Sequence, residues 1–242
     1  MRLQTPTWLR GGLALLLSLG GVAAQGNFQN LGFESATLVP VSGHPPFYYF
    51  AQAFPGWTGY EGGVQEGLTV YNALAMSTAG ISIIDAAYQP LPGYGSTGGL
   101  IQGSYTAVLM SGHSGVNQPT DATIAQTELV PVGTQSLRFK AQFAPFNSSG
   151  SFGVTLGGQT LSLAPIASGA NYTLYAADVH ALAGQTAGLA FTVFSYPQQL
   201  AADYLFLDSI QFSNVPVPEP GVFGLSALGV LLLGWRSIRW RR

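Results

Sequence analysis

The sequence predicts an all-β protein, an antiparallel β-sandwich that carries a targeting segment at each end. Short strand-like runs predict the sheets, and turn residues separate these runs about every 8 to 12 positions. No stretch between residues 25 and 215 keeps the period of an amphipathic helix. We therefore expect a signal peptide at 1–24, a β-sandwich domain at 25–213, a linker at 214–220 and a C-terminal single transmembrane helix at 221–242.

The clearest strand lies in QSLRFKAQF, residues 135–143. Its apolar residues Leu137, Phe139 and Phe143 alternate with polar ones, which is the two-residue period of a strand with one solvent-facing side. In VTLGGQTLSL the pair Gly157-Gly158 predicts a two-residue hairpin turn. Four further runs have the same character, at 104–110, 151–163, 171–179 and 188–196.

Charge is scarce and uneven along the chain. Charged residues make up 7% of the sequence, far below the typical quarter. Between Gln25 and Pro216 only Arg138 and Lys140 are basic, against nine acidic residues, so this body has a net charge of −7. The absence of a basic patch argues against nucleic acid as a partner. With no cysteine, disulfides and thiolate metal sites are excluded.

The two ends of the chain indicate export. Arg2 and Arg10 both precede a short apolar stretch that ends in small residues, which is the pattern of a signal peptide. We expect cleavage after Ala24. Near the other end, Gly221 to Trp235 is an uncharged run of 15 residues, whereas a helix that crosses a bilayer needs roughly 20. The segment comes closer to that length if it continues to Ile238 and its arginine side chains snorkel to the membrane surface. The positive-inside rule then leaves the acidic body outside the inner membrane. Four arginines follow the run: Arg236, Arg239, Arg241 and Arg242.

This C-terminal arrangement resembles the PEP-CTERM sorting signal of Gram-negative bacteria. The tripeptide Pro218-Glu219-Pro220 is followed by Gly221, the apolar segment and the arginine cluster, in the order of that family. The resemblance covers about 25 residues of the chain. It implies an exosortase-type sorting protease as a partner, anchoring in the inner membrane before processing, and a final place on the cell surface or in the extracellular matrix.

A second resemblance concerns the body. The opening NLGFES (30–35) and the closing DYLFLDSIQFS (203–213) resemble the first and last strands of galactose-binding-like jelly rolls, which include carbohydrate-binding modules. The resemblance implies a jelly-roll topology over most of residues 27–214. It also implies a structural calcium ion held by Glu34 and Asp208, since such relatives pair an acidic residue of each terminal strand. The alternative is that both are ordinary carboxylates at the rim.

Aromatic residues gather in residues 44–63 and offer candidate ligand contacts. Trp57, Tyr60, Tyr88 and Tyr94 are the residues that could stack on the apolar faces of sugars. For Trp57 the alternative is a place in the core, because the segment after the first strand commonly supplies a core tryptophan in such sandwiches.

No catalytic motif is evident, and we expect the protein not to be an enzyme. His113 in MSGHSG superficially resembles a nucleophile elbow, but the G-x-S-x-G spacing is absent and a polar loop is expected there. Glu61 and Glu66 are expected in a loop, at a spacing that predicts no glycosidase pair. The sequence predicts an exported structural or adhesive protein. The alternatives are a carbohydrate-binding module for exopolysaccharide and, more weakly, a glycan-active hydrolase.

Overall fold

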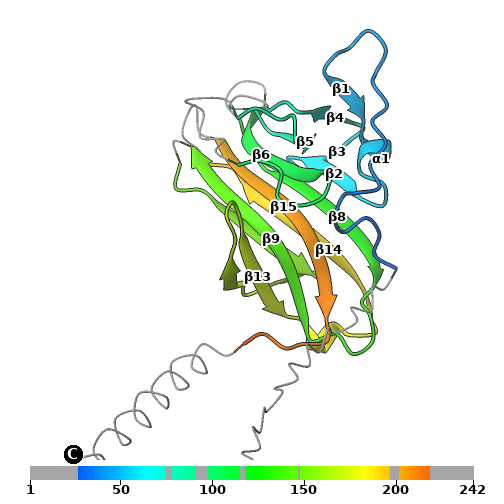
Figure 1. Cartoon of the computed structure of the whole chain (residues 1–242), viewed down its shortest axis with the longest axis vertical. Helices are drawn as coiled ribbons and strands as arrows, with labels where there is room; N and C mark the ends of the chain where they lie inside the picture. Colours follow the sequence, from blue (N-terminus) through cyan, green and yellow to red (C-terminus); the bar gives the residue numbers. More distant parts are fainter. Residues whose placement is uncertain are drawn as a thin grey trace, which may run out of the picture.

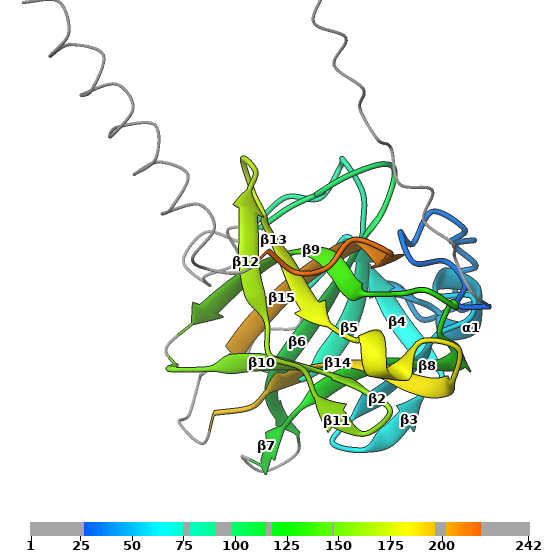
Figure 2. The ribbon, with the colours of Figure 1, turned by 90° about the horizontal axis from the view of Figure 1, so that it is seen from below.

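The computed structural model describes residues 27–74, 78–90, 98–114, 118–146, 148–196 and 202–218. These residues form two sheets packed face to face, with very little helix (Figures 1 and 2). The predicted all-β sandwich is confirmed at this level. Helix is confined to one four-residue turn, α1 (Phe50–Ala53), and one 3₁₀ turn, η1 (His180–Leu182), in the described residues. None of the helices there has the length and apolar run needed for a bilayer crossing.

The first sheet contains nine described strands in the order β1-β4-β5-β6-β15-β9-β13-β12, with β7 paired to β6. Its pairs are antiparallel except β4 with β5, which are parallel, so the expectation of a wholly antiparallel sandwich was wrong at this edge. The strands are β1 (Phe47–Tyr49), β4 (Leu68–Tyr71), β5 (Gly80–Ile84), β6 (Thr106–Ser114), β7 (Gln118–Thr120), β9 (Ser136–Phe146), β12 (Ala164–Ser168), β13 (Thr173–Asp178) and β15 (Ala202–Ser213).

The second sheet contains six described strands in the order β11-β10-β14-β8-β2-β3. In Figure 2 the strands β10, β14 and β8 lie on one side and β9, β12 and β13 on the other, so the two layers are seen separately. The strands are β2 (Thr58–Glu61), β3 (Val64–Glu66), β8 (Ala122–Leu129), β10 (Ser151–Leu156), β11 (Gln159–Thr160) and β14 (Thr186–Phe194).

The main core fills the space between the sheets, and β15 is covered on both faces. Leu205 and Leu207 belong to the core between the sheets, whereas Tyr204 and Phe206 belong to a second cluster. Side chains alternate across a strand, so the second cluster lies on the outer face of the first sheet. It also contains Tyr88, which comes from the segment after β5.

The two ends of the sandwich differ in what they carry. At one end β1, β4 and β5 stand beside β2 and β3, and at the other the chain leaves through residues 214–218 (Figure 1). The start of β9 pairs with the end of β15 at Ser136 and Ser213, which places the exit of the chain beside the first residues of β9.

Candidate functional site

Trp57 is a core residue, so the core-packing alternative is the one confirmed. Its side chain is 5% exposed and packs against Phe33 and Phe191, with ring centroids 5.8 and 6.4 Å away. Its indole Nε1–H donates to the carbonyl of Asn30 at 3.1 Å, which satisfies the polar edge of the ring. Neither face of this ring is open to a sugar.

The other three aromatic candidates do not form one platform with Trp57. Tyr88 is 6% exposed and lies in the outer cluster against Phe206, at a centroid distance of 6.3 Å. Tyr60 is half-buried on β2, and Tyr94 lies outside the described residues. Tyr60 is therefore the one described candidate whose ring is partly accessible.

An aromatic groove forms elsewhere, between β9, β10 and the β12–β13 hairpin. We call this groove of about 460 Å³ the tyrosine groove. Phe152 contacts Phe143 and Tyr175, with ring centroids 5.4 and 5.6 Å away, so the rings form one continuous apolar floor. The volume falls in the range of small-molecule sites. The groove is lined by Ala141, Gln142, Phe143, Phe152, Ser168, Gly169, Ala170, Asn171, Tyr172, Thr173 and Tyr175.

The hairpin turn positions Tyr172 at the rim. A Cβ added at Gly169 would lie 2.3 Å from the Tyr172 ring, so only glycine lets the ring pack over the turn. The Gly169 N–H donates to the carbonyl of Tyr172 at 2.8 Å, which closes the turn. Nζ of Lys140 lies over the same ring, 4.9 Å from its centroid, which is a cation–π distance.

Two of the residues that line the tyrosine groove carry amide side chains. Oε1 of Gln142 is buried and accepts no hydrogen bond from the residues that the structure describes. Asn171 donates from Nδ2 to the carbonyl of Leu100 at 2.8 Å, which fixes its orientation. An unpaired buried acceptor is costly unless a ligand or water pairs with it. Gln142 pairs with Phe206 of the outer cluster, however, so its side chain lies on the opposite face of β9 from Phe143 and is not part of the aromatic floor.

Sequence reasoning missed the tyrosine groove because its residues come from three separate strands and a turn. Phe143 and Phe152 were assigned to strands, but the periodicity of one strand does not show which other strand it meets. A signal was present in SGANYT, residues 168–173, where a Gly-containing turn is followed by an aromatic residue.

Glu34 and Asp208 hold the same loop from the two terminal segments of the domain. The Ser104 N–H donates to both carboxylate oxygens of Glu34, at 3.0 and 2.9 Å. Oδ2 of Asp208 accepts from the Gln102 N–H at 3.1 Å and from the Thr106 hydroxyl at 2.9 Å. Hydrogen bonds to the first and last segments of the domain therefore hold residues 102–106, an arrangement that we call the clip.

The clip contains oxygen ligands of the kind that the calcium expectation requires. Carboxylate and hydroxyl oxygens are the ligands that calcium prefers. Burial raises the pKa of Asp208 to about 6, although hydrogen bonds from Thr106, Ser209 and Gln102 act in the opposite direction. The partners seen at both carboxylates, however, are N–H and O–H donors, and the described residues contain no group of three acidic or imidazole ligands. Calcium at Glu34 and Asp208 stays a prediction.

Two expectations about candidate catalytic residues were wrong in their local structure. Glu61 lies on β2 and Glu66 on β3, rather than in a loop. The two strands are paired with Gly59 opposite Glu66. His113 lies in β6, which continues to Ser114 because it pairs there with β7, so no polar loop is present.

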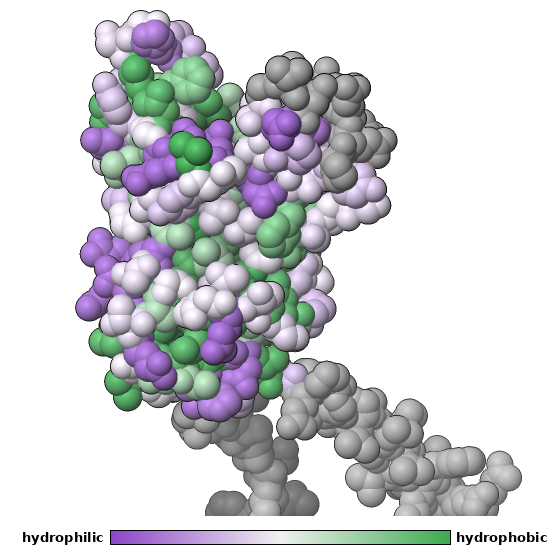
Figure 3. All heavy atoms as spheres, turned by 180° about the vertical axis from the view of Figure 1, so that it is seen from behind, coloured by the Kyte–Doolittle hydropathy of each residue, from purple (hydrophilic) through white to green (hydrophobic). Residues whose placement is uncertain are grey.

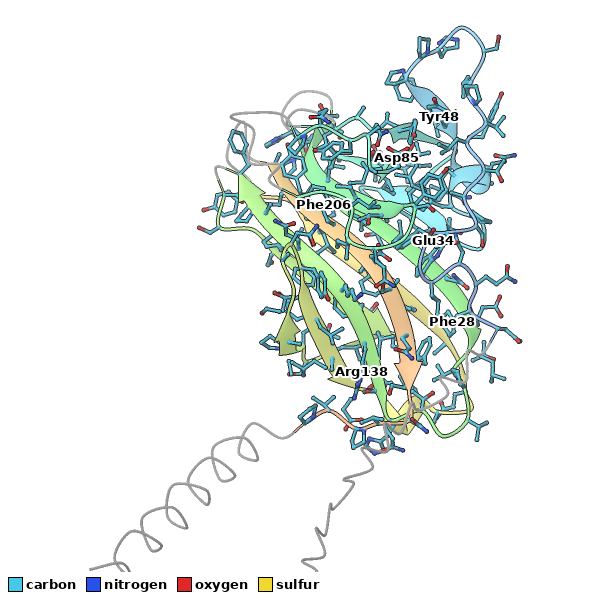
Figure 4. The ribbon with its side chains drawn as sticks, in the orientation of Figure 1. Phe28, Glu34, Tyr48, Asp85, Arg138 and Phe206 are labelled. Carbon is cyan, nitrogen blue, oxygen red and sulfur yellow. The ribbon has the colours of Figure 1, made fainter. Side chains whose placement is uncertain are left out.

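The sorting motif lies mostly outside the described residues, which end at Pro218. Just before it, the chain is fastened to β9. The carbonyl of Val215 accepts hydrogen bonds from Ser136 Oγ at 2.6 Å and from Arg138 at 3.2 Å, and the carbonyl of Pro216 accepts one from Arg138 at 3.3 Å. Figure 4 shows Arg138 at this end of the sandwich, opposite Tyr48 and Asp85.

Comparison with known proteins gives a likeness in structure but no family. No protein-family model matches the chain, and no curated protein matches it. Among solved structures it is similar to "TmCBM61 in complex with beta-1,4-galactotriose", with a TM-score of 0.41 and 12% sequence identity. The similarity covers 78% of this chain and 97% of that chain. No family assignment follows.

Proposed function

We propose that the protein is an exported, non-catalytic surface or matrix protein whose sandwich binds polysaccharide in the tyrosine groove. The observation that carries this proposal is the aromatic floor of Phe143, Phe152 and Tyr175 in the tyrosine groove, with Asn171 and Tyr172 of the hairpin turn beside it. Sugars present apolar C–H faces and hydroxyl groups together, so a site for them needs aromatic rings and amide or hydroxyl partners at the same place.

The charge of the domain favours a neutral glycan. The body carries a net charge of −7, so a polyanionic chain would meet repulsion over most of the surface. Lys140 is the one cation near the groove, and it is engaged by the Tyr172 ring and by Oε1 of Gln102. A neutral polysaccharide needs neither charge compensation nor a free cation.

The terminal segments support export and sorting as part of the same proposal. The chain begins with a signal-peptide pattern and finishes with Pro218-Glu219-Pro220-Gly221, an apolar run and four arginines. We propose that an exosortase-type protease processes this tail at the inner membrane, and that the mature protein stays on the cell surface or in the matrix. The membrane holds the chain only until processing.

A glycan-array screen of the full chain in detergent tests the binding proposal. We expect neutral polysaccharides to be retained, and Tyr172→Ala to weaken that binding by about tenfold, since stacking on one aromatic ring contributes on the order of 1 kcal/mol or more. Tyr60→Ala on β2 is the matched control and should bind as the unmodified chain does. Equal binding by Tyr172→Ala and the unmodified chain would remove the tyrosine groove from the proposal.

The same glycans separate binding from the two rival functions. A purely structural protein would bind none of them, whereas a hydrolase would release new reducing ends from them during incubation. We expect binding without release.

Sorting is tested by following the size and location of the chain in a producing cell. We expect Glu219→Ala to leave the chain unprocessed in the membrane fraction, while Val217→Ala, outside the tripeptide, is processed normally. Processing of both variants at the same rate would contradict the sorting proposal.

A further inference from the structure

A second cleft lies between β5, the β1–β4 ribbon and the β2–β3 hairpin. It has a volume of about 450 Å³, and we call it the glutamate cleft. This cleft is lined by Pro46, Phe47, Glu61, Glu66, Leu68, Thr69, Val70, Ala73, Leu74, Thr78, Ala79, Gly80, Ile81 and Met110. Hydrophobic residues are visible on the surface at the end of the molecule that carries β1 (Figure 3).

Its walls are apolar and partly open to solvent. Phe47 is 42% exposed and Leu68 39% exposed. Phe47 pairs with Val70 across β1 and β4, and Leu68 is two residues from Val70, so all three side chains lie on one face of the ribbon. Exposed aromatic and aliphatic residues that line a cleft are a common feature of ligand sites.

Its charged groups are two carboxylates that accept no hydrogen bond within the described part of the chain. Gly59 pairs with Glu66 and Glu61 with Val64, so Glu61 and Glu66 are diagonal neighbours on the same face of the hairpin. His180 and Asp178 form the one ion pair found among the described residues, and none of these residues donates a hydrogen bond to either glutamate. Burial, and then the charge of Glu66, raises the pKa of Glu61 to about 7.

This combination restricts the chemistry of the occupant. A neutral or purely apolar ligand would leave the carboxylates unpaired in a partly dehydrated site, which is unfavourable. An acidic ligand would add repulsion. A protonated amine supplies three N–H donors and a positive charge to the two carboxylates, and an attached ring with an apolar C–H face can pack on Phe47.

We infer that the glutamate cleft binds an amino sugar with a free, protonated amine. The two carboxylates pair with the ammonium group, and the ribbon face that carries Phe47 and Leu68 receives the ring. The site is separate from the tyrosine groove, which contains none of the same residues. The inference about the glutamate cleft can therefore be tested independently of the proposed neutral-glycan site.

Calorimetry with two matched sugars tests this inference on the full chain in detergent. The probes are the β-1,4-linked tetramer of glucosamine and the same tetramer with every amine acetylated. We expect the free amine form to bind at least about tenfold more tightly, because acetylation removes the charge that the glutamates pair with. Equal affinity for the two tetramers would overturn the assignment.

Charge-matched variants locate the binding. Glu61→Gln and Glu66→Gln should each weaken binding of the free amine tetramer by about tenfold, since each removes a charge-assisted partner of the ammonium group. Glu128→Gln removes one negative charge toward the other end of β8 and should leave binding unchanged. An equal loss of affinity with Glu128→Gln would mean that binding depends only on the net charge of the domain, and would overturn the assignment of the glutamate cleft as the binding site.

Two further arms keep the test decisive. Phe47→Ala alters an exposed side chain and should weaken binding without unfolding the domain, so it serves if Glu61→Gln folds poorly. Binding of 1,5-diaminopentane as tightly as the glucosamine tetramer would show that the ring contributes nothing, and would overturn the sugar assignment. Tyr172→Ala should leave glucosamine binding intact, which separates this result from the fate of the tyrosine groove.

Discussion

Asp203 is an aspartate enclosed in the sandwich with one of its oxygens unpaired. The residue is 0% exposed, and it lies opposite Ser111 on the neighbouring strand β6. Ser148 donates a hydrogen bond to Oδ1, whereas Oδ2 of Asp203 and Oγ of Ser111 have no hydrogen-bond partner in the part of the chain that the structure describes. Burial, the largest cause, raises the pKa of Asp203 because the charged form loses its hydration.

This residue predicts a stability that falls as the pH rises. The folded state binds the proton of Asp203 more tightly than the unfolded chain does, so its contribution is fully present below about pH 4, the ordinary pKa of aspartate, and is lost as the pH rises through the folded pKa. We expect Asp203→Asn to flatten the dependence of the unfolding free energy between pH 4 and pH 8, measured by urea denaturation. An unchanged slope would contradict the buried, proton-binding aspartate.

At the scale of elements, strands with a single periodicity could be predicted from the sequence. The alternation around Phe139 gave β9 a core side and an outer side, and the Gly157-Gly158 turn joins β10 to β11 with positive φ at both glycines. In β15 the run Tyr204 to Leu207 is apolar at every position, and the structure explains this by covering both of its faces.

The region before residue 100 could not be assigned in the same way. Its strands are three to five residues long, and one pair is parallel, so alternation does not reveal them; the β2–β3 turn at Gly62-Gly63 is a two-glycine hairpin signal that sequence reasoning missed. Both clefts depend on contacts between such elements. The tyrosine groove joins β9, β10 and a hairpin, and the glutamate cleft joins the β2–β3 hairpin to β1, β4 and β5, contacts that no single stretch of sequence contains.

Trp57, just before β2, packs on Phe33 of the opening segment, and this contact gives a prediction. Its ring contacts Phe33 and Phe191 inside the main core, and truncation would leave a large cavity there. We expect Trp57→Ala to destabilise the fold by about 3 to 5 kcal/mol, as for other large-to-small changes in cores. Tyr60→Ala, three residues further on and half-buried, should cost much less. Chemical denaturation of both variants makes the comparison, and equal losses would contradict the core assignment of Trp57.

For the whole molecule, the clip at residues 102–106 connects the two terminal segments, and the calcium expectation belongs there. If Glu34 and Asp208 hold an ion, calcium binds the folded state and not the unfolded chain, so it must raise the melting temperature. We expect the purified chain to melt higher in calcium than in chelator, and Glu34→Gln to abolish the difference. An identical melting temperature in both solutions would leave a clip made of hydrogen bonds alone.

The arrangement of the two ends predicts how the domain stands on the membrane before processing. The turn that carries Val132 precedes β9, whose first residue pairs with Ser213, so this turn lies at the end where the chain leaves. Val64 lies on β3, at the opposite end, beside the glutamate cleft (Figure 1). The contacts of Ser136 and Arg138 with Val215 leave few residues between the folded domain and the anchor expected from residue 221.

Because the chain contains no cysteine, single cysteines report this orientation without a background signal. Val64 is 67% exposed and Val132 is 81% exposed, so Val64→Cys and Val132→Cys should react at similar rates in detergent. In membranes that hold the unprocessed chain, we expect a bulky maleimide to label Val64→Cys at the detergent rate and Val132→Cys several-fold more slowly, since the bilayer then lies close to that turn. Equal labelling of the two in membranes would mean that the domain stands clear of the bilayer or has no fixed orientation on it.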